Sequence, residues 1–510
     1  MAQRWVMVCV LGLMTMGGTV ALLFVVHWPR MYRPLASVLV LMAAFNTYFM
    51  WQYGVVIDST MLTNALHTDA NEVRDLMTWQ LVVCVGLIAG PALWWVWRDP
   101  VSGLPALKRL GLNMAGALLG LGLVVVAALA GYQELSSLMR NHKDLRFMIN
   151  PLNSVYGMSL LAAEQLPHQV RTLRPVGEDA RLGASYTAQG RVPLLVLVVG
   201  ETARAENWQL NGYPRPTTPK LLQWQAKGGL VNYSDVRSCG TNTQVSVPCM
   251  FSPLTRAQGG DRPPEEENLL DVLQRAGLAV LWLDNQSGCK GVCDRVPNVD
   301  TRHSPLPRFC ADGECADVVM LQDLDARIAA LDPVRRAKGV VLVMHQIGSH
   351  GPAYAKRRPH EVTPFLPECT SATLADCAPE ELVNAYDNTI ARTDDFLHHV
   401  LRWSYFHERE GRYDTGVIYM SDHGESLGES GLYLHGLPYA LAPSQQTHVP
   451  MVSWLSPGLQ TRVGVSDACM QRRAGEPLSH DNLFHTVLGL MDVKTQVYEP
   501  TLDAFKPCEP

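Results

Sequence analysis

The chain has 510 residues, which is too long for one ordinary hydrophobic core, so we expect two or three folded units. Lys and Arg number 42 and Asp and Glu number 48, which gives a net charge of −6 with neutral histidines. This balance argues against nucleic acid as a partner, because proteins that bind its phosphates are usually basic.

Four apolar runs near the N-terminus predict a transmembrane domain over residues 1–131. The runs cover residues 5–26, 35–56, 81–97 and 110–131. Each is about as long as the ~17 to 25 residues that a helix needs to cross a bilayer. The first run exceeds the roughly 7 to 15 apolar residues of a signal peptide, and no small-residue cleavage site follows it. We therefore expect four membrane-spanning helices.

The charges of the short connecting loops predict the orientation of these helices. Two loops are basic, and they carry Arg30, Arg33, Arg98, Lys108 and Arg109. The loop between the second and third runs is acidic, with Asp58, Asp69, Glu72 and Asp75. Because basic loops stay in the cytoplasm, the acidic loop and all residues after 131 are expected outside.

Residues 132–191 are expected to bridge this domain to a second one. Their first part mixes apolar and charged positions, which is typical of a helix that lies on the membrane surface. Their last part is polar and contains glycine, as linkers do.

Residues 192–510 show the pattern of an α/β domain. Apolar strands begin at Val192, Leu278, Gly339 and Thr415, and helical patterns begin at Asn268 and Glu381. Strands that alternate with helices predict a mostly parallel sheet covered by helices on both faces. In such sheets ligands bind beyond the carboxyl ends of the strands.

Polar residues follow each of the four predicted strands. Glu201 follows the first, Asp284 to Gln286 the second, and Asp422 with His423 the fourth, while the third leads to His345 and His350. Carboxylate oxygens and imidazole nitrogens suit a borderline cation such as zinc. Alone, each residue could be a structural cap or a satisfied polar group. Glu201, Asp422 and His423 together predict a metal site, with His350 and His435 as further candidates.

The segment "VRSCGTNTQVSVPCM", residues 236–250, is a candidate nucleophile loop. It offers three hydroxyls, at Thr241, Thr243 and Ser246, between Cys239 and Cys249. A threonine hydroxyl becomes a good nucleophile when a dication lowers its pKa. A disulfide would restrict the loop and could hold one hydroxyl against a metal. Alternatively, the hydroxyls serve local turns.

Cysteine usage is consistent with an exported domain. Two of the twelve cysteines, Cys9 and Cys84, lie in apolar runs, and ten follow residue 191. Closely spaced cysteines in an exported domain predict disulfides. A zinc ribbon is the alternative for the set Cys289, Cys293, Cys310 and Cys315.

Five motifs carry a family resemblance. They are "VVGETARAENWQLNGYPRPTTPKL", "VRSCGTNTQVSVPCMFS", "HQIGSHGPAY", "YMSDHGESLGESGLYLHGLP" and "LSHDNLFHTVLGLMDV". Together the motifs resemble those of the phosphoethanolamine transferases that modify lipid A, including the mobile colistin-resistance enzymes. The match runs from about Leu35 to the C-terminus. The resemblance implies an alkaline phosphatase or sulfatase-like catalytic domain on a helical membrane anchor.

The resemblance also implies roles for single residues. Thr243 matches the nucleophile that becomes phosphoethanolaminylated, and with Glu201, Asp422 and His423 it matches the ligands of a tightly bound zinc ion. His350 and His435 match histidines for substrate handling or for a second, weaker zinc ion. Positions that contact the phosphoethanolamine group are matched by Thr241, Gln286, Ser287, Lys290 and Glu425, with Gln286 standing where a relative has asparagine. Positions that bind the lipid headgroup are matched by Asn64, Thr68 and Glu72, although a solvated helix face also explains their spacing of four.

Nearest-neighbour pairing of the ten exported cysteines predicts five disulfides. The expected pairs are Cys239 with Cys249, Cys289 with Cys293, Cys310 with Cys315, Cys369 with Cys377 and Cys469 with Cys508. The first, third and fourth resemble family disulfides. The second closes a very short loop, which makes it the least secure.

The expected function is a zinc-dependent transferase that moves phosphoethanolamine from phosphatidylethanolamine to a lipid A phosphate, through a phosphoethanolamine-threonine intermediate. This activity implies resistance to cationic polymyxins. We expect a monomeric, multi-pass protein of the inner membrane of a Gram-negative cell, with the catalytic domain in the periplasm and no nucleic acid partner. A core sugar or another glycan as acceptor, a phosphoglycerol transferase or phosphodiesterase of the same fold, and a non-catalytic sensor remain alternatives. The family usually has five spans, so either this chain lacks the first helix or its start lies upstream.

Overall fold

The structure is a computed structural model. It describes residues 2–57, 59–66, 73–74, 76–98, 103–132, 135, 148–165, 173–187, 190–259, 265–304, 308–311, 314–356 and 363–508. The chain forms two compact units, one that contains the N-terminal apolar helices and one that contains the C-terminal domain from Gln169 onward.

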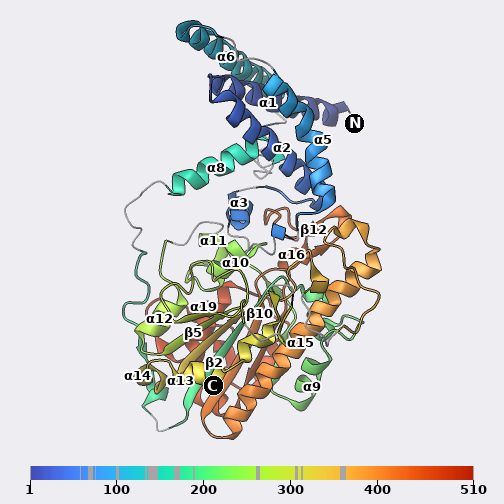
Figure 1. Ribbon diagram of the computed structural model, residues 1–510. Helices are drawn as coiled ribbons and strands as arrows, with labels where there is room; N and C mark the ends of the chain where they lie inside the picture. Colours follow the sequence, from blue (N-terminus) through green and yellow to red (C-terminus); the bar gives the residue numbers. More distant parts are fainter. Residues whose placement is uncertain are drawn as a thin grey trace. The chain divides into compact units, whose positions relative to one another are not determined.

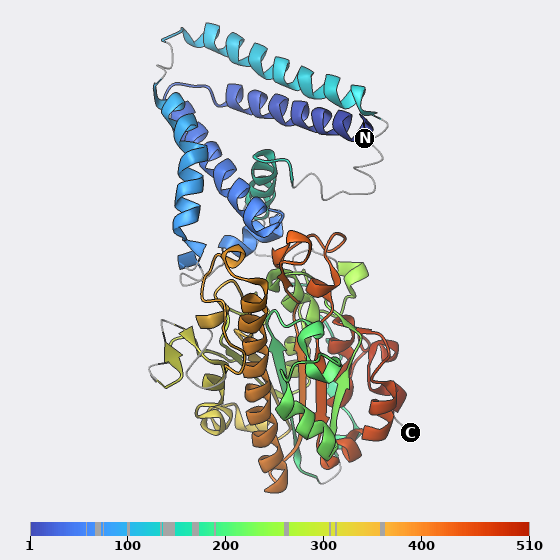
Figure 2. The same ribbon diagram turned by 90° about the vertical axis from the view of Figure 1, so that its right-hand side faces the viewer.

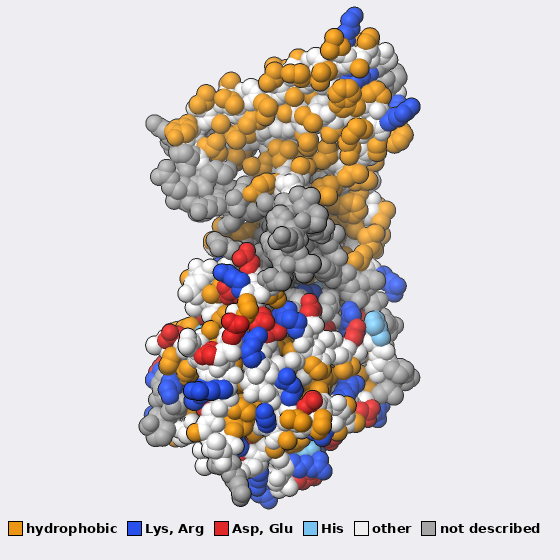
Figure 3. All heavy atoms as spheres, turned by 90° about the vertical axis from the view of Figure 1, so that its left-hand side faces the viewer, with side chains coloured by type: hydrophobic (Ala, Val, Ile, Leu, Met, Phe, Trp, Pro, Cys, Tyr) orange, Lys and Arg blue, Asp and Glu red, His pale blue; other side chains and the backbone are white. Residues whose placement is uncertain are grey.

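Within the described residues, four helices of the first unit are long and apolar enough to cross a membrane. They are α1 (Ala2–Val25), α2 (Tyr32–Tyr53), α5 (Trp79–Arg98) and α6 (Ala106–Ala130). Each overlaps one of the four apolar runs of the sequence, within a few residues at either end. Hydrophobic side chains cover the visible face of this unit, whereas charged side chains are spread over the other unit (Figure 3).

Glycines allow α1 and α6 to pack with their backbones close together. A Cβ atom on Gly17 would lie 2.7 Å from the carbonyl oxygen of Gly120, and one on Gly120 would lie 2.6 Å from the carbonyl oxygen of Gly17. A larger residue at either position would force the helices apart. Small residues serve the same purpose in other membrane helix pairs.

A buried polar cluster fixes α8 (Leu152–Gln165) against α2. The Asn46 amide donates to Asn153 Oδ1 at 3.4 Å and to Ser154 Oγ at 2.5 Å. Asn153 in turn donates to the carbonyl of Ile57 at 3.3 Å, shortly before α3 (Ser59–Leu66). The surface helix expected after residue 131 falls largely outside the described residues, which leave α8 as its described part.

The second unit is built on a seven-stranded sheet. Its order is β3 (Leu230–Tyr233), β13 (Met451–Leu455), β10 (Tyr413–Ser421), β2 (Val192–Gly200), β9 (Val340–His345), β5 (Ala279–Asp284) and β6 (Asn298–Asp300). The strands from β10 to β6 are parallel neighbours, and β13 runs antiparallel to β10 and β3. The four predicted strands are the adjacent central ones, so the expected mostly parallel sheet is confirmed.

Helices cover both faces of this sheet, as Figures 1 and 2 show. The side chains of β2 alternate between the two cores. Leu195, Leu197 and Val199 pack with α12 (Leu269–Arg275) and α19 (Asp481–Leu490). The side chains between them pack with α9 (Pro219–Lys227) and the long α15 (Pro379–Arg409). Burial on both faces explains why the strand sequences are almost continuously apolar.

Short elements complete the second unit. Its further helices are α10 (Thr243–Met250), α11 (Arg256–Gly259), α13 (Leu324–Ala329), α14 (Pro333–Arg336), α16 (Ser444–Thr447), α17 (Pro457–Val463) and α18 (Asp467–Arg473). Its two-residue strands are β1 (Arg181–Leu182), β4 (Val236–Arg237), β7 (Cys310–Ala311), β8 (Glu314–Cys315), β11 (Ser426–Leu427), β12 (Tyr433–Leu434), β14 (Leu478–Ser479) and β15 (Val493–Lys494). A turn at residues 410–412, with Gly411 in the left-handed region at φ 73°, joins α15 to the amino end of β10.

All five expected cysteine pairs are bonded in the structure. Cys289 is bonded to Cys293 and Cys310 to Cys315, so these four cysteines provide no thiolate for a zinc ribbon. Cys9 and Cys84 are free.

Candidate active site and metal centre

The carboxyl ends of the central strands bring several polar residues to one edge of the sheet, which we call the rim. The rim residues are Glu201, Asp284, His345, Asp422 and His423. In the strand register Ser421 of β10 is opposite Gly200 of β2, and His345 of β9 is opposite both Val199 and Asp284. The residues that end or follow these strands are therefore neighbours in space, although up to 222 positions separate them in the chain.

Glu201, Asp422 and His423 form a compact group of metal-ligating atoms at this rim. One ligand atom of each lies within 4.8 Å of the others. His423 Nε2 is 3.4 Å from Glu201 Oε1 and 3.3 Å from Asp422 Oδ2. All three side chains are buried. Thr202, next to Glu201, has a left-handed φ of 59° and donates its N–H to Asp422 Oδ1, which fixes the two carboxylates to each other.

The charges of this group depend strongly on one another. Burial opposes ionisation of Glu201, but the hydrogen bond and charge of His423 outweigh it and lower the Glu201 pKa. Burial and the negative charge of Glu201 raise the pKa of Asp422. Burial also opposes protonation of His423, yet the charges of Asp422 and Glu201 raise its pKa. The buried carboxylates thus favour positive charge at this point, which a proton or a cation can supply.

The group fits a zinc ion by its donor atoms and by an unsatisfied oxygen. Two carboxylates and an imidazole are ligand types that zinc takes. Asp422 Oδ2 is buried and accepts no hydrogen bond from the described residues. A buried carboxylate oxygen without a donor is costly unless a charge compensates it. Glu201, Asp422 and His423 are therefore the residues that could hold a metal.

Thr243 presents its hydroxyl to this group from the first turn of α10. Its Oγ1 is 3.1 Å from Glu201 Oε1, 3.2 Å from Glu201 Oε2 and 3.5 Å from His423 Nε2. The preceding residue, Asn242, caps the helix by accepting from Val245 N at 3.1 Å. Because helix N-termini favour negative charge, this position suits both an oxyanion and a phosphoryl group. Of the three hydroxyls in the loop, that of Thr243 is the one that contacts the rim.

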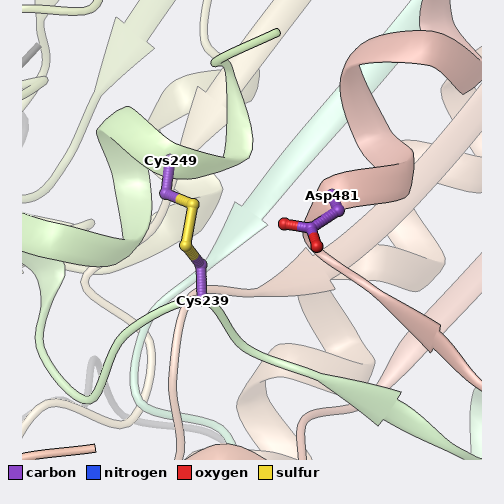
Figure 4. Close-up of side chains that lie close together, drawn as sticks. All are labelled: Cys239, Cys249 and Asp481. Atoms are coloured by element: carbon purple, nitrogen blue, oxygen red, sulfur yellow. A yellow bond between two sulfur atoms is a disulfide. The ribbon is translucent and has the colours of Figure 1, made fainter. Parts of the chain in front are cut away.

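The Cys239–Cys249 disulfide ties the start of the nucleophile loop to the end of α10, as Figure 4 shows. Asp481 lies beside it, but both sulfurs are in the disulfide, so this trio is not a metal site. His480 joins the loop to the rim, because its Nδ1 accepts from Cys239 N at 3.0 Å and its Nε2 donates to the carbonyl of Ser421 at 2.9 Å. The loop is therefore held from two sides.

His435 lies against the His423 ring, and His350 lies against His435. The ring centroids of His423 and His435 are 4.3 Å apart, and those of His350 and His435 are 5.5 Å apart. The buried carboxylate of Glu425 contacts His435 Nδ1 at 3.1 Å through Oε2 and accepts from the Tyr354 hydroxyl at 3.0 Å through Oε1. Both Glu425 oxygens thus have partners inside the protein, and within the part of the chain that the structure describes His435 Nε2 is the ring nitrogen left for a ligand.

The expected phosphoethanolamine contacts fall into two places. Gln286, Ser287 and Lys290 form one chain after β5, since the Ser287 hydroxyl donates to Gln286 Oε1 and accepts from Lys290 Nζ, both at 2.8 Å. Thr241 donates to the carbonyl of Leu437 at 2.6 Å and so connects the nucleophile loop to the segment of His435. Among the expected headgroup residues, Thr68 and Glu72 lie outside the described residues, and of Asn64 only the backbone, in α3, is described.

His345, Tyr354 and Asp317 also shape the site, although sequence analysis did not select them. His345 ends β9, contacts Asp284 Oδ2 through Nδ1 at 3.1 Å, and places Nε2 4.0 Å from Glu201 Oε2. Asp317 accepts from Asn285 Nδ2 and from the backbone N–H of Ile347, both at 2.9 Å, so it joins the loops after β5 and β9. The only signal for His345 was its position as a polar residue at the end of an apolar strand.

Comparison with known proteins assigns a class to this fold and rim. The family model described as Sulfatase matches residues 193–493, and the model described as Phosphoethanolamine transferase EptA/EptB matches residues 16–166. The C-terminal unit therefore has the alkaline phosphatase/sulfatase-like fold that the sequence predicted.

Individual relatives then define the family. Phosphoethanolamine transferase EptA of Salmonella typhimurium is 40% identical over 482 residues, which cover 93% of this chain and 85% of the relative. Phosphatidylethanolamine transferase Mcr-1 of Escherichia coli is 38% identical over 478 residues, 90% of this chain and 84% of the relative. The solved structure of the integral membrane lipooligosaccharide phosphoethanolamine transferase A (EptA) of Neisseria meningitidis matches with a TM-score of 0.86 at 36% identity, and covers 96% of this chain and 90% of that one. This chain belongs to the phosphoethanolamine transferase family.

Proposed function

We propose that this protein transfers phosphoethanolamine from phosphatidylethanolamine to a phosphate of lipid A. One observation carries the proposal beyond the family: the Thr243 hydroxyl lies 3.1 Å from the Glu201 carboxylate, at a helix N-terminus beside Asp422 and His423. A nucleophile held in this way suits the formation of a covalent intermediate.

The proposed reaction has two displacements at phosphorus. In the first, Thr243 Oγ1 forms a bond to the phosphorus, the bond to the glycerol oxygen breaks, and diacylglycerol leaves with the proton that Thr243 gives up. In the second, an oxygen of a lipid A phosphate forms a bond to the same phosphorus, the bond to Thr243 Oγ1 breaks, and Oγ1 takes up the proton of the attacking phosphate, which regenerates Thr243. The N-terminus of α10 and the Lys290 ammonium would balance the charge on the transferred group.

Zinc is the cofactor that we assign to this site. Glu201, Asp422, His423 and Thr243 would hold one ion, and His350 with His435 would bind a second ion or the substrate. A dication bound there would lower the pKa of the Thr243 hydroxyl and would supply positive charge to the transferred phosphoryl group. Glu201 has a role of its own, since its carboxylate oxygens orient the Thr243 hydroxyl.

The proposed organisation confines the reaction to a membrane surface. Residues 1–131 would span the inner membrane of a Gram-negative cell several times. Residues 132–191 would connect this part to residues 192–510, which would act in the periplasm. The protein would be a monomer. Donor and acceptor are both lipids, so each reaches the protein by diffusion within the bilayer. The added ammonium group would weaken the binding of cationic polymyxins to lipid A and so give resistance.

Mass spectrometry of lipid A tests this proposal. Cells that express the protein should gain lipid A species with one added phosphoethanolamine, and cells that express Thr243→Ala at the same level should not. Purified protein in phosphatidylethanolamine nanodiscs should release diacylglycerol faster when lipid A is added. If free phosphoethanolamine is released whether or not lipid A is present, the protein is a hydrolase and the proposal is wrong.

A further inference from the structure

A pocket of about 460 Å³ opens beside the nucleophile. Gln244, which follows Thr243, lines it on one side, and the segment that runs from the end of β5 through β6 lines the other. Five charged residues contribute to the lining, namely Asp284, Lys290, Asp294, Asp300 and Arg302. This lining suits a polar, charged group and not an acyl chain.

Two of the three carboxylates in the pocket already have partners. Asp284 accepts from Trp282 Nε1 at 2.9 Å and contacts His345 Nδ1 at 3.1 Å, and its other oxygen accepts two backbone N–H groups. Asp300 is paired with Arg302 through two contacts of 2.7 and 3.0 Å. These groups therefore leave little net charge for a ligand.

Lys290 and Asp294 are the two charged residues that the loop after β5 adds to the pocket lining. Lys290 Nζ donates to the hydroxyl and the carbonyl oxygen of Ser287 at 2.8 and 3.3 Å. Asp294 is exposed and forms no ion pair with a described cationic side chain, and the neighbouring Arg295, whose pKa its charge helps to raise, is paired with Asp271. The Cys289–Cys293 disulfide closes the turn that carries both residues. Within this turn Lys290 adopts a left-handed φ of 52°, which is a strained conformation for a residue with a side chain. Strained backbone of this kind is often found at ligand sites.

We propose that Asp294 binds the ammonium of the transferred phosphoethanolamine, while Lys290 lies beside its phosphate. The inference rests on the proposed function and adds a specificity residue to it. A zwitterionic headgroup is bound best by a cation and an anion that are held at a fixed spacing. The turn closed by the Cys289–Cys293 disulfide carries both charges. An uncharged glycerol headgroup gains nothing from Asp294, so this carboxylate selects phosphatidylethanolamine over phosphatidylglycerol.

Donor preference of the full-length protein in nanodiscs tests the inference. Wild-type protein should release diacylglycerol from phosphatidylethanolamine much faster than from phosphatidylglycerol. In Asp294→Asn the KM for phosphatidylethanolamine should rise about tenfold with an unchanged kcat, as the loss of one charged contact implies. The rate with phosphatidylglycerol should stay the same, so the preference also falls about tenfold.

Two further variants separate a specific contact from a general loss of charge. Asp294→Glu keeps the carboxylate and should retain most of the preference. Asp300→Asn removes a carboxylate of the same pocket that is already paired with Arg302, and it should leave the preference within about twofold of the wild-type value.

The ammonium site and the proposed function would be contradicted by different results. Wild-type release that depends on Thr243, combined with an unchanged KM and preference in Asp294→Asn, overturns the ammonium site and leaves the transferase intact. A Thr243→Ala variant that releases diacylglycerol as fast as wild type overturns the proposed function and the ammonium site together.

Discussion

The Glu425 carboxylate orients the His435 imidazole, and the Tyr354 hydroxyl holds that carboxylate in place. Glu425 contacts His435 Nδ1, and the Tyr354 hydroxyl donates to the other Glu425 oxygen. Burial and the charge of Glu425 raise the pKa of Tyr354 well above its usual value, so this phenol keeps its proton and remains a donor. Because a carboxylate only accepts hydrogen bonds, the His435 proton is kept on Nδ1.

Removal of the Tyr354 hydroxyl should slow catalysis and leave substrate binding unchanged. In Tyr354→Phe one oxygen of buried Glu425 loses its donor, and we expect kcat to fall about 10- to 100-fold, as for other residues that orient a ligand or a catalytic group. The KM for phosphatidylethanolamine should not change. Initial rates of diacylglycerol release over a range of donor concentrations give both constants.

Tyr213→Phe is the matched control for this experiment. Its hydroxyl also donates to a carboxylate oxygen, that of Asp387 at 2.9 Å, but Asp387 makes no contact with the rim residues. Equal losses of kcat in the two variants would contradict a positioning role for Tyr354.

His480 should make the stability of the C-terminal unit depend on pH. Burial lowers the pKa of His480 to about 4, well below its ordinary value. Between about pH 6.5 and pH 4 the unfolded chain therefore binds a proton that the folded protein excludes, so stability falls as the pH falls through this window. We expect a loss of up to about 3 kcal/mol, measured by denaturant unfolding at several pH values.

His480→Gln isolates this contribution. A glutamine amide can accept from Cys239 N and donate to the Ser421 carbonyl, and it does not titrate. The slope of stability against pH should become flatter in the variant. An unchanged slope would mean that other groups cause the acid sensitivity.

At the scale of elements, the proposed nucleophile Thr243 is fixed by a short helix that is closed by a disulfide. The bond spans ten positions from Cys239 to Cys249, which corresponds to a stabilisation of about 3 kcal/mol from the lost freedom of the unfolded chain. The Cys239→Ala, Cys249→Ala double variant should lose this stability and also most of its transfer activity, because the start of α10 is then held from one side only. Thermal unfolding and lipid A modification measure the two effects.

The Cys310–Cys315 disulfide offers a control of the same kind. It closes the short hairpin of β7 and β8, which carries none of the rim residues. Its removal should lower stability and leave transfer activity close to the wild-type level. Full activity after removal of Cys239 and Cys249 would show that this disulfide does not position Thr243.

Sequence patterns predicted the elements that are buried on both faces. The strands β2, β5, β9 and β10 appear as continuous apolar runs, because each has a core on either side. In contrast, β3, β6 and β13 were not predicted, since they are short and β6 is mostly exposed. The segment of α10 was interpreted as a loop, because small polar residues interrupt its apolar ones and Pro248 lies inside the helix.

The same contrast holds for the site. Glu201, Asp422 and His423 could be predicted to cluster because each follows a strand, and parallel strands bring such positions to one rim. The partnership of Tyr354 with Glu425 joins residues 71 positions apart and depends on side-chain directions that no local pattern contains. The roles of single residues came from the family resemblance and remain proposals.

At the scale of the whole molecule, the proposed zinc ion should stabilise one of the two compact units. A ligand present at 100 times its Kd adds about 2.7 kcal/mol to the stability of the state that binds it. Chelation should therefore lower the unfolding temperature of the C-terminal unit and abolish transfer, and zinc should restore both. Calorimetry of the full chain in detergent, with and without chelator, measures the shift.

Glu201→Gln provides the control for this measurement. The variant keeps the shape of the side chain but removes a charge that the cation needs, so its unfolding temperature should no longer respond to zinc or to chelator. An equal response in the variant would place the stabilising metal elsewhere.

The carboxyl ends and the amino ends of the strands should differ in how well they tolerate inserted residues. The rim residues lie at the carboxyl ends of the strands, whereas the turn at residues 410–412 lies at the amino end of β10 and is exposed. Exposed turns of this kind accept inserted sequence more readily than any other part of a domain. An affinity tag or a fluorescent reporter placed between Gly411 and Arg412 would therefore leave the reaction undisturbed, which makes this turn the preferred attachment point for imaging the protein in cells.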